Sequence, residues 1–178
     1  MSLKHAILVL LETDPGSGYD LLKRFKERLG YFWNASHQQI YMQLKKMSQD
    51  GLLDFEQQTQ SGKPDRKVYK ITQDGHQALL DWIEAPVKVS RVNDALLVKM
   101  YAGHLVDSQI IQREIAQHVA VHSAMLDTFL ALEKNYLAMA KPQQKSYALP
   151  YLTLRKGILG EQAWLAWAQE VEVFLAAR

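Results

Sequence analysis

The chain has 178 residues, of which 48% are hydrophobic, so it can form a packed core and is not a disordered tail. It contains no cysteine, which excludes disulfides, thiolate metal sites and a catalytic thiol. The formal net charge is only +2 at pH 7, so a nucleic-acid partner would have to be recognised through the distribution of charge and not through its sum.

Two short helices are predicted at the start of the chain. Residues 3–12 form an apolar helix that is too short to span a membrane. Its apolar run, residues 6–11, is also shorter than the hydrophobic region of a secretory signal and is followed at once by Glu12. We therefore expect no signal peptide, no membrane span and a cytoplasmic location. Residues 14–18 predict a turn and residues 19–29 a second helix, whose inward positions are Leu21, Leu22, Phe25 and Leu29.

The next helix is predicted over residues 36–50, with a signal at each end. The Ser36 side chain can accept a hydrogen bond from a free N–H group of the first turn, and Gln39 three residues later completes a capping box. Gly51 can adopt the left-handed conformation that ends many helices.

The two faces of this helix differ in chemistry. Ile40, Leu44 and Met47 recur at steps of four and three residues, so they share one buried face. The opposite face has no acid before Asp50 and combines amides, a phenol and a lysine, which can reach base edges and phosphates. We expect Gln38, Tyr41 and Lys45 to enter a groove of DNA, with Ser36, His37 and Met42 beside them.

A β-hairpin is predicted after the helix. Residues 52–56 and 68–71 alternate well enough between apolar and polar side chains to form short strands. The connection, residues 57–67, is rich in turn-forming residues and contains three cations, Lys63, Arg66 and Lys67. On a hairpin tip these cations could follow the DNA backbone or enter a minor groove. The alternative is a solvated hairpin without a ligand.

The order helix, helix, recognition helix and hairpin is that of a winged helix-turn-helix. Thr72 can cap one further helix, which should stop before Pro86. We therefore expect residues 1–86 to be a DNA-binding domain, with helix 36–50 in the major groove and wing 57–67 on the flanking backbone or in a minor groove.

Residues 87–178 predict a second, helical domain. A helix is expected over residues 90–102, a long one from Asp107 to about residue 140, and a last one from about residue 150, after a break at Pro142. The two long helices carry apolar seams that could pair as an antiparallel, coiled-coil-like hairpin and bury their remaining apolar surface in a homodimer. The alternative is a self-contained bundle. The expected dimerisation residues are Ile111, Ile115, Met125, Phe129, Trp164, Trp167 and Val171.

Two other groups of residues have weaker interpretations. Glu114, His118 and His122 share one helix face. Without a third strong metal ligand, we expect them to be polar positions that set the register of the apolar seam. A metal site and a pH-dependent dimer are the alternatives. A planar ligand could stack near the domain junction, although these aromatic side chains could simply pack the domains together. The aromatic residues concerned are Tyr31, Trp33, Trp82 and Tyr101.

An enzyme is not expected. Gly62 and Lys63 do not belong to a phosphate-binding loop, because Gln57 stands where its first glycine is required and Pro64 where its hydroxyl residue is required. There is no dinucleotide fingerprint and no Gly-x-Ser-x-Gly elbow. We expect no cofactor. An adaptor that keeps the fold but acts through protein partners is the alternative to a DNA-binding regulator.

Several motifs resemble those of the PadR family of bacterial transcriptional regulators. They are residues 17–20, residues 36–41 with Leu44, Gly51 with Leu52, and residues 62–72 with Gly75 and Trp82. Residues 30–33, residues 35–39 and the C-terminal half are similar to the virulence activator AphA subgroup of that family. The resemblance implies a dimeric DNA-binding regulator with a C-terminal dimer interface, in which a small aromatic effector, a co-regulator or RNA polymerase could be a further partner. It determines neither the operator nor the sign of regulation.

Overall fold

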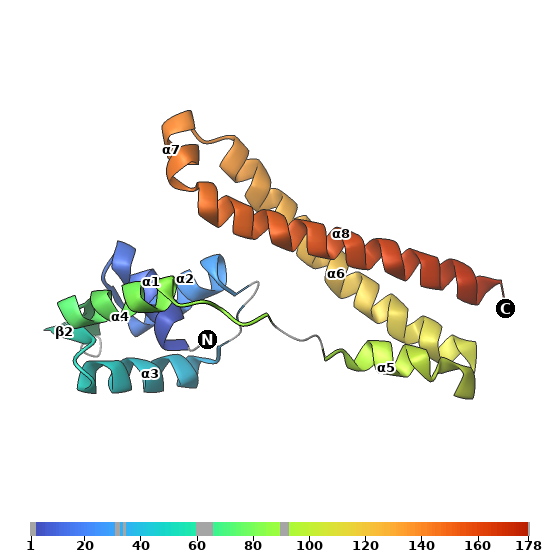
Figure 1. The fold of residues 1–178 in the computed structure, drawn as a ribbon, viewed down its shortest axis with the longest axis horizontal. Coiled ribbons are helices and arrows are strands. Elements are labelled where there is room, and N and C mark those ends of the chain that lie inside the picture. Colours follow the sequence, from blue (N-terminus) through green and yellow to red (C-terminus); the bar gives the residue numbers. More distant parts are fainter. Residues whose placement is uncertain (1–2, 31–32, 34, 60–65, 90–92, 178) are drawn as a thin grey trace. The chain divides into compact units, whose positions relative to one another are not determined.

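The computed structural model describes residues 3–30, 33, 35–59, 66–89 and 93–177. It divides into two compact units, Met1–Val89 and Ser90–Arg178 (Figure 1). The fold is mainly helical, with one small antiparallel sheet in the first unit. Within the described residues, none of the helices combines the length and the apolar character that crossing a membrane requires.

The first unit packs four helices around one core. They are α1 (Leu3–Thr13), α2 (Gly18–Arg28), α3 (His37–Gln49) and α4 (Gln73–Glu84). Each helix contributes an apolar face to the core, as the sequence spacing predicts. The large side chains that are completely buried are Ile7, Leu8, Leu11, Leu21, Ile40, Leu44, Met47 and Leu53.

The ends of α3 have the predicted caps. The Gln39 N–H donates to Ser36 Oγ at 3.2 Å, and the Ser36 N–H donates back to Gln39 Oε1 at 2.8 Å. Gly51 has a φ of 75°, in the left-handed region where a side chain would be strained. The Thr72 side chain caps α4 and also donates to the Gly51 carbonyl oxygen at 2.7 Å, so the end of α3 is joined to the start of α4.

The sheet has three strands, one more than predicted. Strands β1 (Gly16–Ser17), β2 (Leu53–Gln58) and β3 (Arg66–Ile71) lie in the order β1-β3-β2, and both pairings are antiparallel. The interpretation of residues 14–18 as a turn alone was wrong, because residues 16 and 17 pair with the free edge of β3. Both hairpin strands are also longer than predicted, so that Arg66 and Lys67 belong to β3 and not to the connection.

The second unit is built on a helical hairpin. The long helices α6 (Ser108–Leu137) and α8 (Ala148–Ala176) run antiparallel along one another, and the short helix α7 (Lys141–Ser146) lies at the turn between them (Figure 1). The helix α5 (Ala95–Tyr101) and the 3₁₀ turn η1 (Gly103–Leu105) precede α6. Helix α5 was predicted to begin at Ser90, but it begins after Asp94, whose side chain accepts a hydrogen bond from the Leu96 N–H at 2.8 Å.

The segment between α6 and α8, where a helix break at Pro142 was predicted, contains a short helix that was not predicted. Pro142 lies in the first turn of α7, where its missing N–H costs no helical hydrogen bond. The last helix consequently starts at Ala148, two residues before the predicted start.

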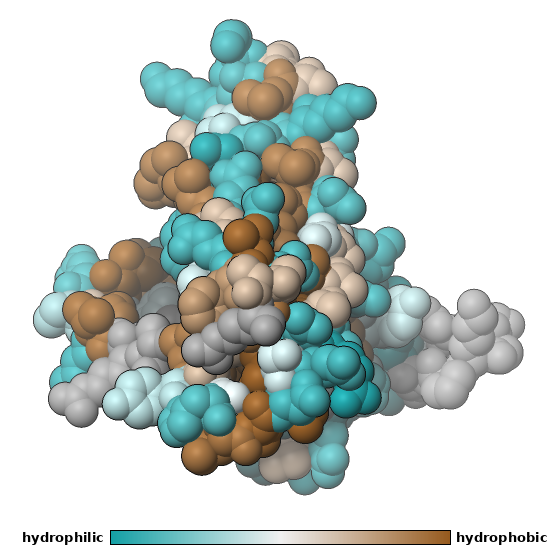
Figure 2. All heavy atoms as spheres, turned by 90° about the vertical axis from the view of Figure 1, so that its right-hand side faces the viewer, coloured by the Kyte–Doolittle hydropathy of each residue, from teal (hydrophilic) through white to brown (hydrophobic). Residues whose placement is uncertain are grey.

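Apolar residues remain at the surface of the second unit, although the apolar positions between its helices are already packed against one another. Buried Leu96, Ile111, Ile115, Ala168, Val171 and Leu175 form the cluster that joins α5, α6 and α8. Other large apolar side chains of these helices are exposed, among them Leu97, Val121, Leu130, Leu152, Leu159 and Phe174. Figure 2 shows hydrophobic residues open to solvent between hydrophilic ones.

Candidate nucleic-acid interface

The outer face of α3 is fixed by its buried face. Ile40, Leu44 and Met47 are each at most 1% exposed, so the helix cannot rotate about its axis without leaving the core. Every residue predicted to face a DNA groove is consequently exposed; the set is Ser36, His37, Gln38, Tyr41, Met42 and Lys45. Gln49, on the same side, is exposed too. The helix therefore presents amide, phenol, thioether and ammonium groups to a partner.

Tyr41 is held in place from two sides. Its ring lies 4.5 Å from the His37 ring, measured between centroids, on the same helix. It also packs against Gly18 at the start of α2, where an added Cβ atom would stand only 2.5 Å from the ring. An added Cβ atom at residue 18 would displace the Tyr41 ring, so the position of this ring depends on Gly18.

The wing contributes cations along its strand β3. Lys67 Nζ lies 4.3 Å from the centroid of the Phe55 ring, a cation–π contact between β3 and β2. Lys70 forms an ion pair with Glu56 at 3.1 Å. Arg66 forms an ion pair with Asp20 of α2. Lys63, predicted to contact DNA, lies outside the described residues.

A groove of about 440 Å³ separates α3 from the wing. Its walls come from both elements, and two lysines stand among its aromatic residues. The lining residues are Tyr41, Lys45, Ser48, Gln49, Phe55, Lys67 and Tyr69. Burial, with a smaller contribution from the neighbouring Tyr41, raises the pKa of Tyr69 above its ordinary value. Tyr69 is therefore a neutral hydroxyl that can donate a hydrogen bond near neutral pH.

A half-buried carboxylate, Asp20 of α2, pairs with the wing strand β3. Burial raises the pKa of Asp20, but hydrogen bonds from Ser17 and the charges of Arg66 and Arg24 outweigh burial and leave that pKa below its ordinary value. Asp20 is thus ionised at neutral pH and acts as the counter-ion of Arg66. Sequence reasoning missed this pair, although the spacing of Ser17 and Asp20 is itself a helix-capping signal.

The predicted dimerisation residues lie along the hairpin of the second unit. Ile111, Ile115, Phe129 and Val171 are buried within the chain itself, and Met125, Trp164 and Trp167 are partly buried. The structure therefore brings Ile111, Ile115, Trp164, Trp167 and Val171 into one cluster inside one copy, whereas the Phe129 ring lies against Gly157. Their contribution to a dimer stays a prediction.

The three residues considered for a metal contact other side chains, and the His118 ring lies 6.0 Å from the Trp164 ring between centroids. Glu114 pairs with Lys99 at 2.6 Å, and His122 Nδ1 lies 2.5 Å from Glu161 Oε2. His122 also stacks on Trp164 at 3.7 Å between ring centroids. In the part of the chain that the structure describes, no cluster of three or more His, Cys, Asp or Glu residues could hold a metal ion.

The aromatic residues predicted to hold a planar ligand are only partly described. Trp33 and Trp82 pack against the core of the first unit, and Trp82 stacks on His5 at 4.6 Å. Tyr101 is 91% exposed in the second unit, and Tyr31 lies outside the described residues. The ligand site stays a prediction.

Comparison with known proteins gives two family matches that together cover most of the chain. Residues 7–81 match the transcriptional regulator PadR-like family, and residues 92–176 match the virulence activator alpha C-terminal family. The chain is 34% identical to the probable transcriptional regulator Rv1176c of Mycobacterium tuberculosis in an alignment of 181 positions, which covers 96% of this chain and 96% of that protein. These relatives are regulators and not enzymes.

Two solved structures share the fold over nearly the whole chain. Bacillus subtilis PadR in complex with operator DNA matches with a TM-score of 0.82 and 30% identity, over 97% of this chain and 98% of that one. The Vibrio cholerae virulence activator AphA matches with a TM-score of 0.77 and 34% identity, over 99% of both chains. The Bacillus subtilis protein has also been solved in complex with p-coumaric acid.

Proposed function

The chain belongs to the PadR-like family of transcriptional regulators, and from this premise we propose that it acts as a homodimer on an inverted-repeat operator. One α3 helix of each copy enters a major groove, and each wing lies on the flanking backbone or in a minor groove. The observation that carries the proposal is the exposed face of α3, free of acids, beside a groove that Lys45 and Lys67 line. The similarity to a relative solved in complex with operator DNA supports DNA as the partner.

Side chains in the two parts have different roles in this proposal. Gln38 can make a bidentate contact with a base edge, whereas Lys67 can neutralise a phosphate regardless of sequence. Lys63 and Lys67 are the wing cations assigned to the backbone. Arg66 is not assigned to the backbone, because its guanidinium already has a carboxylate partner.

A second copy explains the apolar surface of the second unit. Exposed Leu130, Leu152 and Leu159 lie on helices whose seam is already filled, so a partner helix could cover them. A two-fold axis would also place two α3 helices on two half-sites, which is why the operator should be an inverted repeat. Sedimentation should report a dimer at micromolar concentration; a monomer there would contradict this part of the proposal.

Operator binding is tested by fluorescence anisotropy. Tiled fragments of the DNA upstream of the gene are compared with scrambled DNA at two salt concentrations. We expect tight, salt-sensitive binding to one fragment. Gln38→Ala should then reduce discrimination between the operator and scrambled DNA by about 1–3 kcal/mol, whereas Lys67→Ala should weaken binding to both. Equal losses on both DNAs for Gln38→Ala would contradict its role, and uniformly weak binding of the wild type would favour the adaptor.

A small aromatic effector is part of the same proposal. The Bacillus subtilis relative has been solved with p-coumaric acid, and this chain carries partly buried indole rings at Trp33 and Trp82. Adding p-coumaric acid to the operator complex should lower its anisotropy and quench tryptophan fluorescence over the same concentration range. An unchanged complex at millimolar ligand would remove this acid as a candidate effector.

A further inference from the structure

One short segment, Gly16–Asp20, contacts both elements of the proposed DNA-binding surface. Its first two residues form β1, with Gly16 opposite Tyr69 and Ser17 opposite Val68 on the wing strand β3. Its last residues form the first turn of α2, which packs against α3. The segment therefore lies where the recognition helix and the wing could be held at a fixed spacing.

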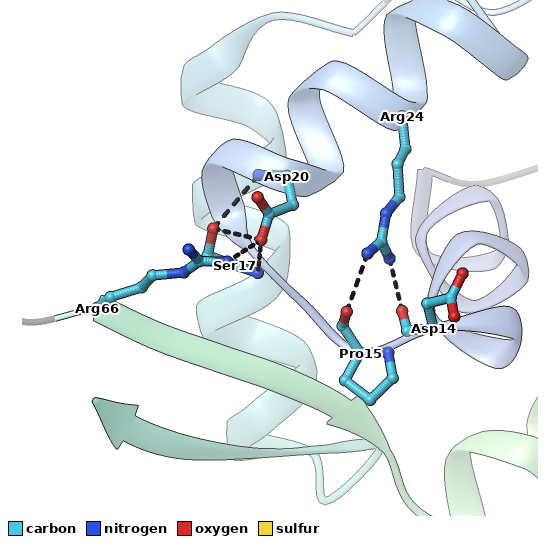
Figure 3. Close-up of polar contacts among 6 residues, drawn as sticks. All are labelled: Asp14, Pro15, Ser17, Asp20, Arg24 and Arg66. Carbon is cyan, nitrogen blue, oxygen red and sulfur yellow. Dashed lines mark hydrogen bonds and ion pairs between the residues drawn. The ribbon is translucent and has the colours of Figure 1, made fainter.

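The contact with the wing is an ion pair held by further hydrogen bonds. Arg66, the first residue of β3, donates to Asp20 Oδ2 (Figure 3). The same oxygen accepts from the Ser17 N–H at 2.8 Å and from Ser17 Oγ at 2.9 Å. Because this capping box fixes the carboxylate, Asp20 offers Arg66 a rigid partner and not a mobile surface charge.

The segment itself is anchored from behind. Arg24, one turn further along α2, donates to the carbonyl oxygens of Asp14 at 2.6 Å and Pro15 at 3.0 Å (Figure 3). These two bonds fix the chain just before β1. Movement of Asp20 away from the wing would therefore require the turn and α2 to move together.

The contact with the recognition helix is steric. Gly18 lies against the Tyr41 ring so closely that an added Cβ atom would meet the Cζ atom at 2.5 Å. Tyr41 is 40% exposed on the face assigned to the DNA groove. Gly18 therefore sets how far the Tyr41 ring can lie toward α2.

We propose that Gly16–Asp20 positions the recognition helix and the wing relative to one another, and that Arg66 is a positioning residue acting through Asp20 and not a phosphate ligand. The inference rests on the proposed operator binding. It follows from the contacts of Arg66: one Nη atom of its guanidinium donates to a carboxylate that the capping box fixes, and its Nε is buried and finds no hydrogen-bond partner among the described residues. A phosphate that approached this guanidinium would meet the negative charge of Asp20 beside it.

Electrostatics alone and the positioning role predict opposite changes in operator affinity for one substitution. Asp20→Asn removes a negative charge close to the DNA-binding surface, so electrostatics alone predicts tighter binding to any DNA. Positioning predicts weaker binding to the operator, because Arg66 loses its ionic partner while the Asn oxygen can still accept from the Ser17 N–H. The two explanations are therefore separated by the direction of the change.

The experiment compares Asp20→Asn, Arg66→Gln and the double variant with the wild type on operator and scrambled DNA over a salt series. Each single variant should lose roughly tenfold in operator affinity, and the double variant should be no worse than either, as expected for two residues that act as one unit. The slope of log K against log salt should stay unchanged in all three. Lys67→Ala is the matched control, from the next position on β3, and should lower that slope by about 0.9 per contact.

Two results would overturn the inference. One is a lower salt slope for Arg66→Gln together with unchanged or tighter binding for Asp20→Asn, which would make Arg66 a phosphate ligand. The other is independent losses that add in the double variant. The same titrations measure how well the wild type discriminates between operator and scrambled DNA. They therefore test the proposed operator binding separately from the role of Arg66.

Hydrogen exchange of the DNA-free protein tests the inference independently of the DNA-binding titrations. The amides of β3 should exchange faster in Asp20→Asn and in Arg66→Gln, by similar factors, while those of α6 and α8 remain as in the wild type. Unchanged β3 exchange in both variants would overturn the inference. A uniform increase over the whole chain would as well, because it would show general destabilisation in place of a local role.

A second pair of variants tests the steric contact without changing any charge. Gly18→Ala should reduce discrimination between operator and scrambled DNA, and the salt slope should stay the same. In a Tyr41→Ala background the same substitution should have no further effect, because the ring it displaces is gone. An equal loss in both backgrounds would refute the role of Gly18 in placing Tyr41.

Discussion

The packing of the helical hairpin can be tested with two glycines of the same helix. Gly157 and Gly160 are three residues apart on α8. A Cβ atom added at residue 157 would lie 2.9, 3.2 and 3.3 Å from three ring carbons of Phe129, whereas one added at residue 160 would have no atom within 4 Å. The substitutions Gly157→Ala and Gly160→Ala therefore differ only in the contact with α6.

The magnitude follows from two opposing terms. Replacing glycine by alanine within a helix stabilises it by about 1 kcal/mol, and both variants gain this amount. Overpacking a filled core costs about 1–3 kcal/mol, and only Gly157→Ala incurs this cost, because its added Cβ atom would press against Phe129, which is only 4% exposed. We expect Gly160→Ala to be about 1 kcal/mol more stable than the wild type and Gly157→Ala to lie about 1–3 kcal/mol below Gly160→Ala.

Urea unfolding followed by circular dichroism at one fixed protein concentration measures this difference. The concentration must be the same for all variants because the free energy of unfolding of a dimer depends on it. Equal stability of the two variants would refute the close approach of α6 and α8 at this point. A loss in Gly160→Ala, accompanied by a shift toward monomer in sedimentation, would place residue 160 in the dimer interface.

Three further predictions concern the first unit. Leu44→Ala should lower the free energy of unfolding by about 2–5 kcal/mol in urea titrations, since this side chain is fully buried; a cost below about 1 kcal/mol would contradict its burial. Ser36→Ala should cost about 1 kcal/mol through loss of the α3 cap, and Ser36→Asn should recover most of it; equal melting temperatures for the two variants would contradict the cap. Burial, followed by the charge of Lys4, lowers the pKa of His5 below its ordinary value, so folding favours the neutral ring. The associated stability is fully present above the unfolded pKa and is lost as pH falls through that value toward the folded pKa. The melting temperature should therefore fall between about pH 7.5 and 5.5, and His5→Gln should weaken this dependence.

The recognition helix could be predicted from sequence because its signals are local. The capping box at Ser36 and Gln39 and the steps from Ile40 to Met47 span only a few turns, and each appears in the structure as predicted. Helix geometry alone relates such positions. No knowledge of the rest of the chain was needed to decide which side of α3 faces outward.

The contacts that position this helix could not be predicted in the same way. Strand β1 has two residues, too few to show an alternation, and its partner strand begins almost fifty residues later in the chain. The Asp20–Arg66 pair joins residues 46 positions apart. Sequence spacing gives no information about such pairs, because they depend on how the elements pack.

The seam of the second unit shows the same limit in a different form. The spacing from Ile111 to Phe129 predicts that α6 needs a partner helix, and the structure supplies α8 of the same chain. Spacing does not say whether a partner belongs to the same copy or to another. The same spacing is therefore compatible with a dimer interface and with burial inside one copy.

The charges of the first unit bear on two proposals, the positioning role of Gly16–Asp20 and the homodimer. Among the described wing residues, Arg66 is paired with Asp20 and Lys70 with Glu56, while Lys67 lies over Phe55. Few phosphates can therefore be neutralised by this part of one copy, and phosphate contacts supply most of the affinity that does not depend on sequence. A second copy would double these contacts, and a fixed spacing of helix and wing would let each base contact form without a further entropy cost. A regulator with a net charge of only +2 would then obtain its discrimination from geometry more than from charge.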